Sequence, residues 1–389
     1  MNTNIKLNKL SINLAASLLA VVLIVLILYA TQTVFIPMVF AVIISVMIFP
    51  LCNFLESKLR LPRALATVLG LIIAITILAG LGYLIVIQVI DIAKDSAMIV
   101  QKLEKLYNQS LGWVTETFSL SQSELLDSLM NELKQAISTI SKYLMTFFSS
   151  FGGMIASFVL VPIYAFFFSY YRDFFRKFFF KAFKSAPREK IEKTLTHMYD
   201  ALQNYMIGQL TVMGIVAVLN TIGLYFMGLD HAWFFGLLCS LLMILPYVGI
   251  AIGSIFPAIF ALATFDSPYY ALGVVAWFQV VQFLEGNFIT PNIVGGKVSL
   301  NPMVSMLAII FGGMLFGFAG FMLALPMTAL LKVIFDSIPQ TEAFGYLLGD
   351  PETEDKKEES NSEENSDLIE STEEVEEEIE TTEEEEIKE

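Results

Sequence analysis

The feature that most constrains this chain is a series of apolar runs too long for the interior of a soluble protein. Of its 389 residues, 56% are hydrophobic and only 16% are charged. A run of about 18 or more apolar residues is typical of a membrane-spanning helix, because about 20 helical residues cross a hydrocarbon layer of about 30 Å. The sequence therefore predicts an all-α integral membrane protein that crosses the bilayer several times.

About eight membrane segments can be drawn along the chain. They are residues 14–30, 34–55, 64–90, 143–171, 202–228, 231–264, 267–290 and 302–336. The first follows Lys6 and Lys9, as the apolar part of a signal peptide would. No small-x-small cleavage pattern closes it, so we interpret it as a retained anchor helix.

Basic residues orient these segments, since Lys and Arg are enriched in the cytoplasmic loops of membrane proteins. The connection 56–63 carries three basic residues and one acidic residue, and residues 172–193 carry eight basic and three acidic ones. Aromatic residues of the same region are expected to form an interfacial belt. We therefore predict a multi-pass protein of the cell membrane with both termini in the cytoplasm.

Five regions follow from this pattern. Residues 1–90 hold three transmembrane helices, and residues 91–142 are an extracytoplasmic segment with leucines at the spacing of amphipathic helices. Residues 143–201 combine a transmembrane helix with the basic and aromatic linker. Residues 202–338 form a core of two broken-helix repeats. Residues 339–389 are an acidic tail: residues 350–389 hold 21 of the 38 acidic residues and no aromatic one, a composition that predicts disorder.

Two segments of the core, 231–264 and 302–336, are too long for one straight crossing, because about 34 helical residues extend for about 50 Å. Residues that interrupt or loosen a helix fall inside them. These are Pro246, Gly249, Gly253 and Pro257 in the first segment, and Gly312, Gly313, Gly317 and Pro326 in the second. Each segment can fold as a re-entrant hairpin of two half-helices or as a kinked single crossing. Hairpins would place Lys297 in the cytoplasm, as the charge rule favours.

With hairpins, residues 202–264 and 267–336 become two copies of one unit inserted in opposite senses. Interrupted segments at corresponding positions of an inverted repeat indicate a transporter's substrate site. The stretch "LEGNFITPNIVGGKVSLNP", residues 284–302, lies between the long apolar segments. Its Pro291 and Gly295–Gly296 predict non-helical backbone, which membrane depth tolerates only beside protein or a water-filled cavity.

Polar side chains near this stretch are candidates for a transport path. Gln279, Gln282 and Glu285 recur at i, i+3 and i+6, within one broad helical stripe. Glu285 is a functional candidate because an ionisable group inside a transmembrane helix is costly, and burial would favour its protonated form and permit proton exchange. The alternative is a structural carboxylate that pairs with Lys297 or caps a helix. Asn220 can face the same cavity or form an interhelical hydrogen bond.

Other chemistry finds little support. The two cysteines and two histidines predict neither a disulfide framework nor a metal site. The chain lacks a G-x-x-x-x-G-K-[ST] phosphate loop and an H-E-x-x-H motif, so we expect no cofactor, no enzyme activity and no use of ATP. Nucleic acid is not an expected partner.

Three motifs resemble the autoinducer-2 exporter-like permease family: "LPYVG" at 245–249, "QFLEGNFITPNIVGGKVSLNP" at 282–302 and "GGMLFGFAGFMLALP" at 312–326. The close resemblance covers about residues 150–339. It implies about eight membrane segments, a homo-oligomer such as a pentamer, and efflux of a small solute. The family's Glu-Gly-Asn-x-x-x-Pro element corresponds to Glu285, Gly286, Asn287 and Pro291, which adds Asn287 to the candidates for the path.

The expected function is a secondary transporter that moves a small polar solute or signalling molecule, coupled to a proton or sodium gradient. Some members of the resembled family are described as cation/proton antiporters, so that activity is the first alternative. The second is a membrane assembly or signalling component, with residues 91–142 or the tail as its partner surface.

Overall fold

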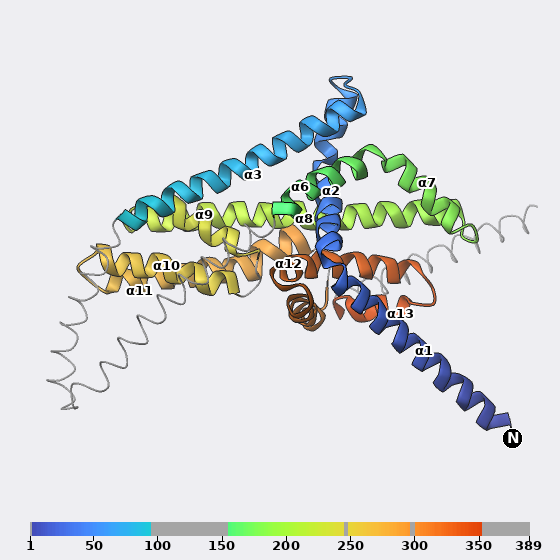
Figure 1. The fold of residues 1–389 in the computed structure, drawn as a ribbon. Coiled ribbons are helices and arrows are strands. Elements are labelled where there is room, and N and C mark those ends of the chain that lie inside the picture. Colours follow the sequence, from blue (N-terminus) through green and yellow to red (C-terminus); the bar gives the residue numbers. More distant parts are fainter. Residues whose placement is uncertain (1, 95–154, 245–247, 296–299, 352–389) are drawn as a thin grey trace, which may run out of the picture.

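The computed structural model describes residues 2–94, 155–244, 248–295 and 300–351, and all regular secondary structure in these ranges is helical (Figure 1). The helices are α1 (Asn2–Ala30), α2 (Gln32–Ser57), α3 (Arg63–Lys94), α6 (Ile155–Tyr170), α7 (Arg172–Ala182), α8 (Arg188–Phe226), α9 (Ala232–Leu242), α10 (Val248–Thr264), α11 (Tyr269–Leu284), the π-helices η1 (Glu285–Ile289) and η2 (Pro291–Gly295), α12 (Pro302–Ser337) and α13 (Glu342–Leu348). The predicted all-helical class is thus confirmed for the described residues.

Several predicted features lie outside these residues. They are Pro246, Lys297, most of the extracytoplasmic segment (residues 95–142) and the acidic tail from residue 352. Residues 342–348, which the sequence assigns to the tail, form α13.

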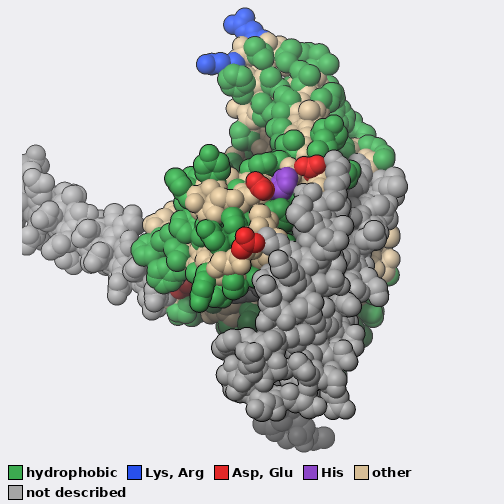
Figure 2. Space-filling view, turned by 90° about the vertical axis from the view of Figure 1, so that its left-hand side faces the viewer, with side chains coloured by type: hydrophobic (Ala, Val, Ile, Leu, Met, Phe, Trp, Pro, Cys, Tyr) green, Lys and Arg blue, Asp and Glu red, His purple; other side chains and the backbone are tan. Residues whose placement is uncertain are grey.

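Five helical segments of the described chain are long and apolar enough to cross a membrane: α2, α3 up to Ile92, α8, the span Tyr269–Val294 and α12. Their outward surfaces are apolar, and on α3, for example, Leu78 and Tyr83 are 63% and 66% exposed. Figure 2 shows hydrophobic side chains over most of the described surface on one face, with few charged groups. Such a surface suits lipid rather than water. The count of eight segments stays a prediction.

Helices α2, α3 and α6 pack through small side chains, as transmembrane helices do when lipid supplies no hydrophobic drive for association. Ala41 and Cys52 of α2 are fully buried with Ala165 of α6. Between α3 and α6, the hydroxyls of Thr67 and Ser169 lie 3.4 Å apart within hydrogen-bonding range. Each of the three helices contacts the other two, and this packing brings the α2–α3 turn close to the start of α7.

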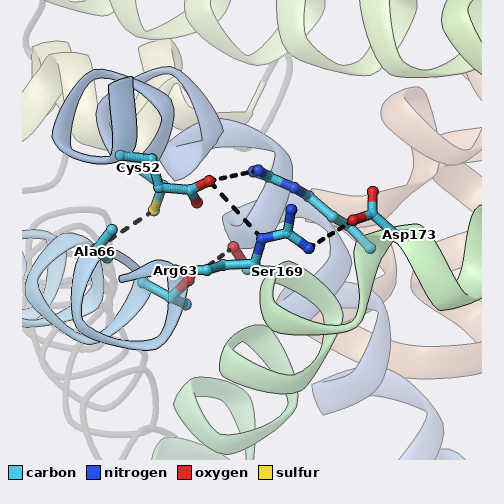
Figure 3. Close-up of polar contacts among 8 residues, drawn as sticks. Cys52, Arg63, Ala66, Ser169 and Asp173 are labelled. Carbon is cyan, nitrogen blue, oxygen red and sulfur yellow. Dashed lines mark hydrogen bonds and ion pairs between the residues drawn. The ribbon is translucent and has the colours of Figure 1, made fainter. Parts of the chain in front are cut away.

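Four charged side chains join at this corner (Figure 3). Arg172 Nη2 donates to Glu56 Oε2 at 2.6 Å, and Arg63 Nη1 donates to Asp173 Oδ2 at 2.7 Å. Arg63 Nε also lies 3.8 Å from Glu56 Oε2, so the two pairs form one network. The hydrogen bond from Arg63 holds the pKa of the Asp173 carboxyl below its usual value. The network connects α2, α3 and α7.

We expect Glu56→Gln to lower the free energy of unfolding by about 1–3 kcal/mol, because Arg172 would lose its carboxylate partner in a largely buried site. The side chains of Glu56 and Arg172 are only 17% and 24% exposed. The measurement is the melting temperature of the purified protein in detergent. In a double-mutant cycle with Arg172→Gln, the paired variant should lose less than the sum of the single variants, and additive losses would contradict the pairing.

Helices α9 and α10 form an antiparallel pair, and α9 packs against α8. The rings of Phe235 and Phe260 are 5.2 Å apart, and Gly253 packs against Cys239. Nearest the connection, a methyl group added at Gly249 would overlap the carbonyl of Leu242. Residues later in α9 contact residues earlier in α10, so the chain must reverse its direction between the two helices.

A second reversal lies inside α12, at Gly317, whose φ of 58° and ψ of −137° are non-helical. A methyl group added at Gly312 would lie 2.7 Å from the carbonyl oxygen of Gly320. In a straight helix these residues would be about 12 Å apart along the axis, so the two arms fold back on each other. Glycine is required at the reversal because L side chains rarely adopt this conformation.

Helix α13 holds the two ends of α12 together. The backbone N–H of Asn301 donates to the carbonyl of Leu348 at 2.9 Å, and an antiparallel bridge joins Leu300 to Gly349. At the other end, Gly345 packs directly against Asp336. Both termini of the folded-back helix therefore lie beside the same short helix.

Candidate functional site

Helix α11 widens where the sequence stretch of interest begins. The backbone N–H of Thr290 donates to the carbonyl of Glu285, five residues earlier, which is the π-helical spacing. Pro291 follows at once and has no N–H to give to a helical bond. Single π-helical turns are rare and occur often at functional sites. The sequence predicted non-helical backbone at Pro291, whereas Pro291–Gly295 is a π-helix, so the chain stays helical there but departs from α-helical geometry.

The carboxylate of Glu285 is held at both oxygens inside this turn. Gln282 Nε2 donates to Oε2 at 2.9 Å, and the hydroxyl of Thr290 donates to Oε1. All three residues are partly buried. The arrangement fixes the position of one carboxylate with two neutral donors, which leaves its charge uncompensated by a cation among the described contacts.

The asparagines of the widened segment form hydrogen bonds with backbone carbonyls. Asn287 Nδ2 donates to the carbonyl of Phe283 at 2.9 Å, and Asn292 Nδ2 donates to that of Phe288 at 2.7 Å. Both side chains are exposed. They satisfy carbonyls near turns that lack regular helical bonding.

The remaining path candidates lie apart from the carboxylate. Gln279 is exposed on α11, six residues before Glu285. Asn220 is 1% exposed on α8, and its Oδ1 has no hydrogen-bond partner within the part of the chain that the structure describes. Of the predicted polar residues, the structure joins only Gln282 to Glu285 by a described side-chain hydrogen bond.

Trp277 of α11 places a polar group at the contact with α8, and sequence reasoning missed it. Its indole packs directly on Gly223 of α8, so no side chain could replace the glycine without displacing the ring. Its Nε1 is buried and, like Asn220 Oδ1, has no partner among the described residues. Asn220 is three residues before Gly223, on the same face of α8. A donor and an acceptor without partners thus lie along one interface between α8 and α11.

The widened segment packs against α8 through apolar side chains. Val281 and Val294 are buried with Val212 and Val216, and Gly208 lies against the backbone of Ile293. This apolar contact fixes the π-helical turns relative to α8.

The glycines and prolines proposed as broken-helix elements occupy different places. Gly249 lies at the start of α10 and Gly317 at the reversal in α12, whereas Pro291 starts η2. Gly253, Pro257, Gly312, Gly313 and Pro326 lie inside helical arms, where the glycines allow close packing and both prolines are buried.

Sequence reasoning also missed a buried lysine side chain. Lys332 of α12 is 5% exposed, and its Nζ donates to Asp336 Oδ2 at 2.8 Å, one helical turn later. The only signal in the sequence is a lysine and an aspartate at i and i+4 at the end of an apolar run. Within the described ranges, no group of three or more His, Cys, Asp and Glu side chains could hold a metal ion.

Comparison with known proteins identifies the relatives of this architecture. Residues 18–340 match the model of the AI-2E family transporter. The protein YrrI of Bacillus subtilis is 28% identical over 321 residues, which cover 78% of this chain and 86% of the relative. The protein YueF of the same organism is 27% identical over 316 residues, 79% of this chain and 85% of the relative. The AI-2 transport protein TqsA of Escherichia coli is 25% identical over 331 residues, 81% of this chain and 89% of the relative.

Proposed function

Because the chain belongs to the AI-2E transporter family, a family of multi-pass membrane transporters, we propose that it is a secondary transporter for a small polar solute or signalling molecule, driven by a proton or sodium gradient. The observation that carries the proposal is the carboxylate of Glu285, held by Gln282 and Thr290 where the helix leaves α-helical geometry. A fixed carboxylate at a break in a transmembrane helix suits the binding of a proton or cation.

We propose that the core works as two inverted repeats. The first consists of α8 followed by the α9–α10 pair, and the second of α11 with its π-helical turns followed by the folded-back α12. The similar order of a long helix and a helical hairpin supports this division. In the proposal both hairpins re-enter the membrane, one from each side, and the path passes between their tips.

The proposed path is lined by Gln279, Gln282, Glu285 and Asn287, with Asn220 on the facing helix. Asn220 Oδ1 and Trp277 Nε1 have no hydrogen-bond partner among the described residues. Because buried polar groups of native proteins nearly always form a hydrogen bond, the two atoms support a polar occupant at the α8–α11 interface. Water, or a solute with both donor and acceptor groups, would form hydrogen bonds with both atoms.

We propose two candidate activities for the same site. TqsA is named as an AI-2 transport protein, which favours a small polar signalling molecule as the solute. The position of Glu285 favours cation/proton antiport as the second candidate, because one carboxylate can exchange a proton for a cation. The proposed setting is the cell membrane, with both termini in the cytoplasm and a homo-oligomer, such as a pentamer, as the working unit.

Reconstitution tests the proposal. The purified full chain is placed in vesicles that contain a pH-sensitive dye, and sodium or autoinducer-2 is added under an imposed proton gradient. We expect a proton flux that depends on one of these two additions and is absent from protein-free vesicles. Proton flux that neither addition changes, in vesicles shown to contain folded protein, would contradict coupled transport of either substrate.

A further inference from the structure

Helix α7 presents one face to the body of the protein through its arginines. Arg172 pairs with Glu56 of α2, and Arg176 Nε donates to Glu192 Oε2 of α8 at 3.1 Å. The two arginines are four residues apart, on one side of the helix. These pairs fix which way α7 faces.

Another face of α7 carries exposed phenylalanines. No residue of the helix is buried, and Phe174 and Phe178 are 66% and 56% exposed. They continue the outward surface of α6: Phe167 stacks on Tyr171 at 6.0 Å, and Tyr171 contacts Phe174 at 6.5 Å between ring centroids. The aromatic surface therefore runs without a gap from an apolar helix of the bundle onto α7.

Lysines occupy the edge beside this aromatic face. Lys177, Lys181 and Lys184 follow at i, i+4 and i+7, and all three are exposed. Within α7, at 100° per residue, Lys177 and Lys181 lie in one narrow sector, next to that of Phe174 and Phe178 and away from the arginines. Lys184 lies in the turn that follows the end of the helix at Ala182. None of the three has an ion pair among the described residues. The nearest acid on the helix, Asp173, already accepts from Arg63.

We propose that this surface, formed by Phe174, Phe178, Lys177, Lys181 and Lys184, binds anionic phospholipid headgroups. Phenylalanine rings enter the boundary of the acyl chains, while lysine side chains extend to the phosphates at headgroup depth. Lipid fits better than free phosphate, because only a bilayer offers a place for the rings. A lysine near an anionic membrane surface changes affinity by about fivefold. The proposed lipid binding requires only that the chain lies in a membrane, so it does not depend on the transport proposal.

The test uses the full chain with Phe178→Trp in bilayers of brominated lipid. Quenching by brominated phosphatidylglycerol is compared with quenching by brominated phosphatidylcholine at equal mole fraction, and the signal of the native tryptophans is subtracted with the parent protein. We expect the anionic lipid to be enriched beside residue 178 by about fivefold or more. The triple change Lys177→Gln, Lys181→Gln and Lys184→Gln should bring the ratio to about one.

A matched control removes the same charge elsewhere: Lys58→Gln, Lys190→Gln and Lys193→Gln should leave the enrichment unchanged. If the first triple variant fails to fold, Lys181→Gln alone should still lose part of the enrichment. No quenching by either lipid would show that protein or water covers this face and would overturn the proposal. Equal quenching by both lipids, or an enrichment that survives the loss of the three lysines, would overturn it as well.

Discussion

Replacing Glu285 by glutamine is expected to reduce coupled proton flux in reconstituted vesicles to the level of protein-free vesicles. Glutamine has nearly the same shape but cannot take up or release a proton at this site. Its amide nitrogen would also face one of the two groups that now donate to the carboxylate, from Gln282 and Thr290. The dye assay under a proton gradient measures the effect directly.

Two further variants make this result specific. Glu342→Gln removes the same charge from an exposed position on α13 and should transport like the wild type. Glu285→Asp keeps an ionisable group and should retain part of the flux. Wild-type flux in Glu285→Gln would remove this carboxylate from the mechanism and leave it the structural role that the sequence also allowed.

The second large effect is expected from Gly320→Ala, because the two arms of α12 have no room for one methyl group. A side chain at Gly320 would overlap the carbonyl of Gly312, so backbone rather than a flexible side chain must move. Overpacking of this kind costs about 1–3 kcal/mol or more. We expect a clear fall in the melting temperature of the detergent-purified protein.

Gly273→Ala is the matched control for that substitution. Gly273 lies inside α11 with open space where a methyl group would go, so alanine there should keep or slightly raise the melting temperature. If Gly320→Ala melts with the wild type, the arms of α12 do not pack as closely as the structure has them.

The sequence predicted the helical class well because long apolar runs leave few other ways to satisfy backbone polar groups in lipid. Among the glycines that it singled out, Gly317 lies at a chain reversal, whereas both described prolines of the two long segments lie inside helices. It did not predict α13, because a helix as short as Glu342–Leu348 beside an acidic tail has no distinctive composition. Helix α8 begins at Arg188 rather than near residue 202, because charged residues extend a helix without any apolar signal.

At the site, sequence reasoning found the carboxylate and one of its two partners. Gln282 and Glu285 are three residues apart, a spacing that an α-helix brings together. Thr290 is five residues from Glu285, and only the π-helical turn places them side by side. Trp277 was missed because its buried Nε1 becomes unusual only once the close approach of α8 is known. Tertiary contacts, rather than periodicity, decide such cases.

The central claim is that the second repeat dips into the membrane and returns, and accessibility of two introduced cysteines tests it most directly. Met303 is 68% exposed before the reversal at Gly317, and Gln340 is exposed after it, whereas the native Cys52 and Cys239 are buried. An impermeant maleimide is applied to Met303→Cys and Gln340→Cys, each in right-side-out and in inverted membrane vesicles. A re-entrant hairpin predicts that both positions react from the cytoplasmic side. Reaction from opposite sides would show a single crossing and contradict the proposed inverted repeat.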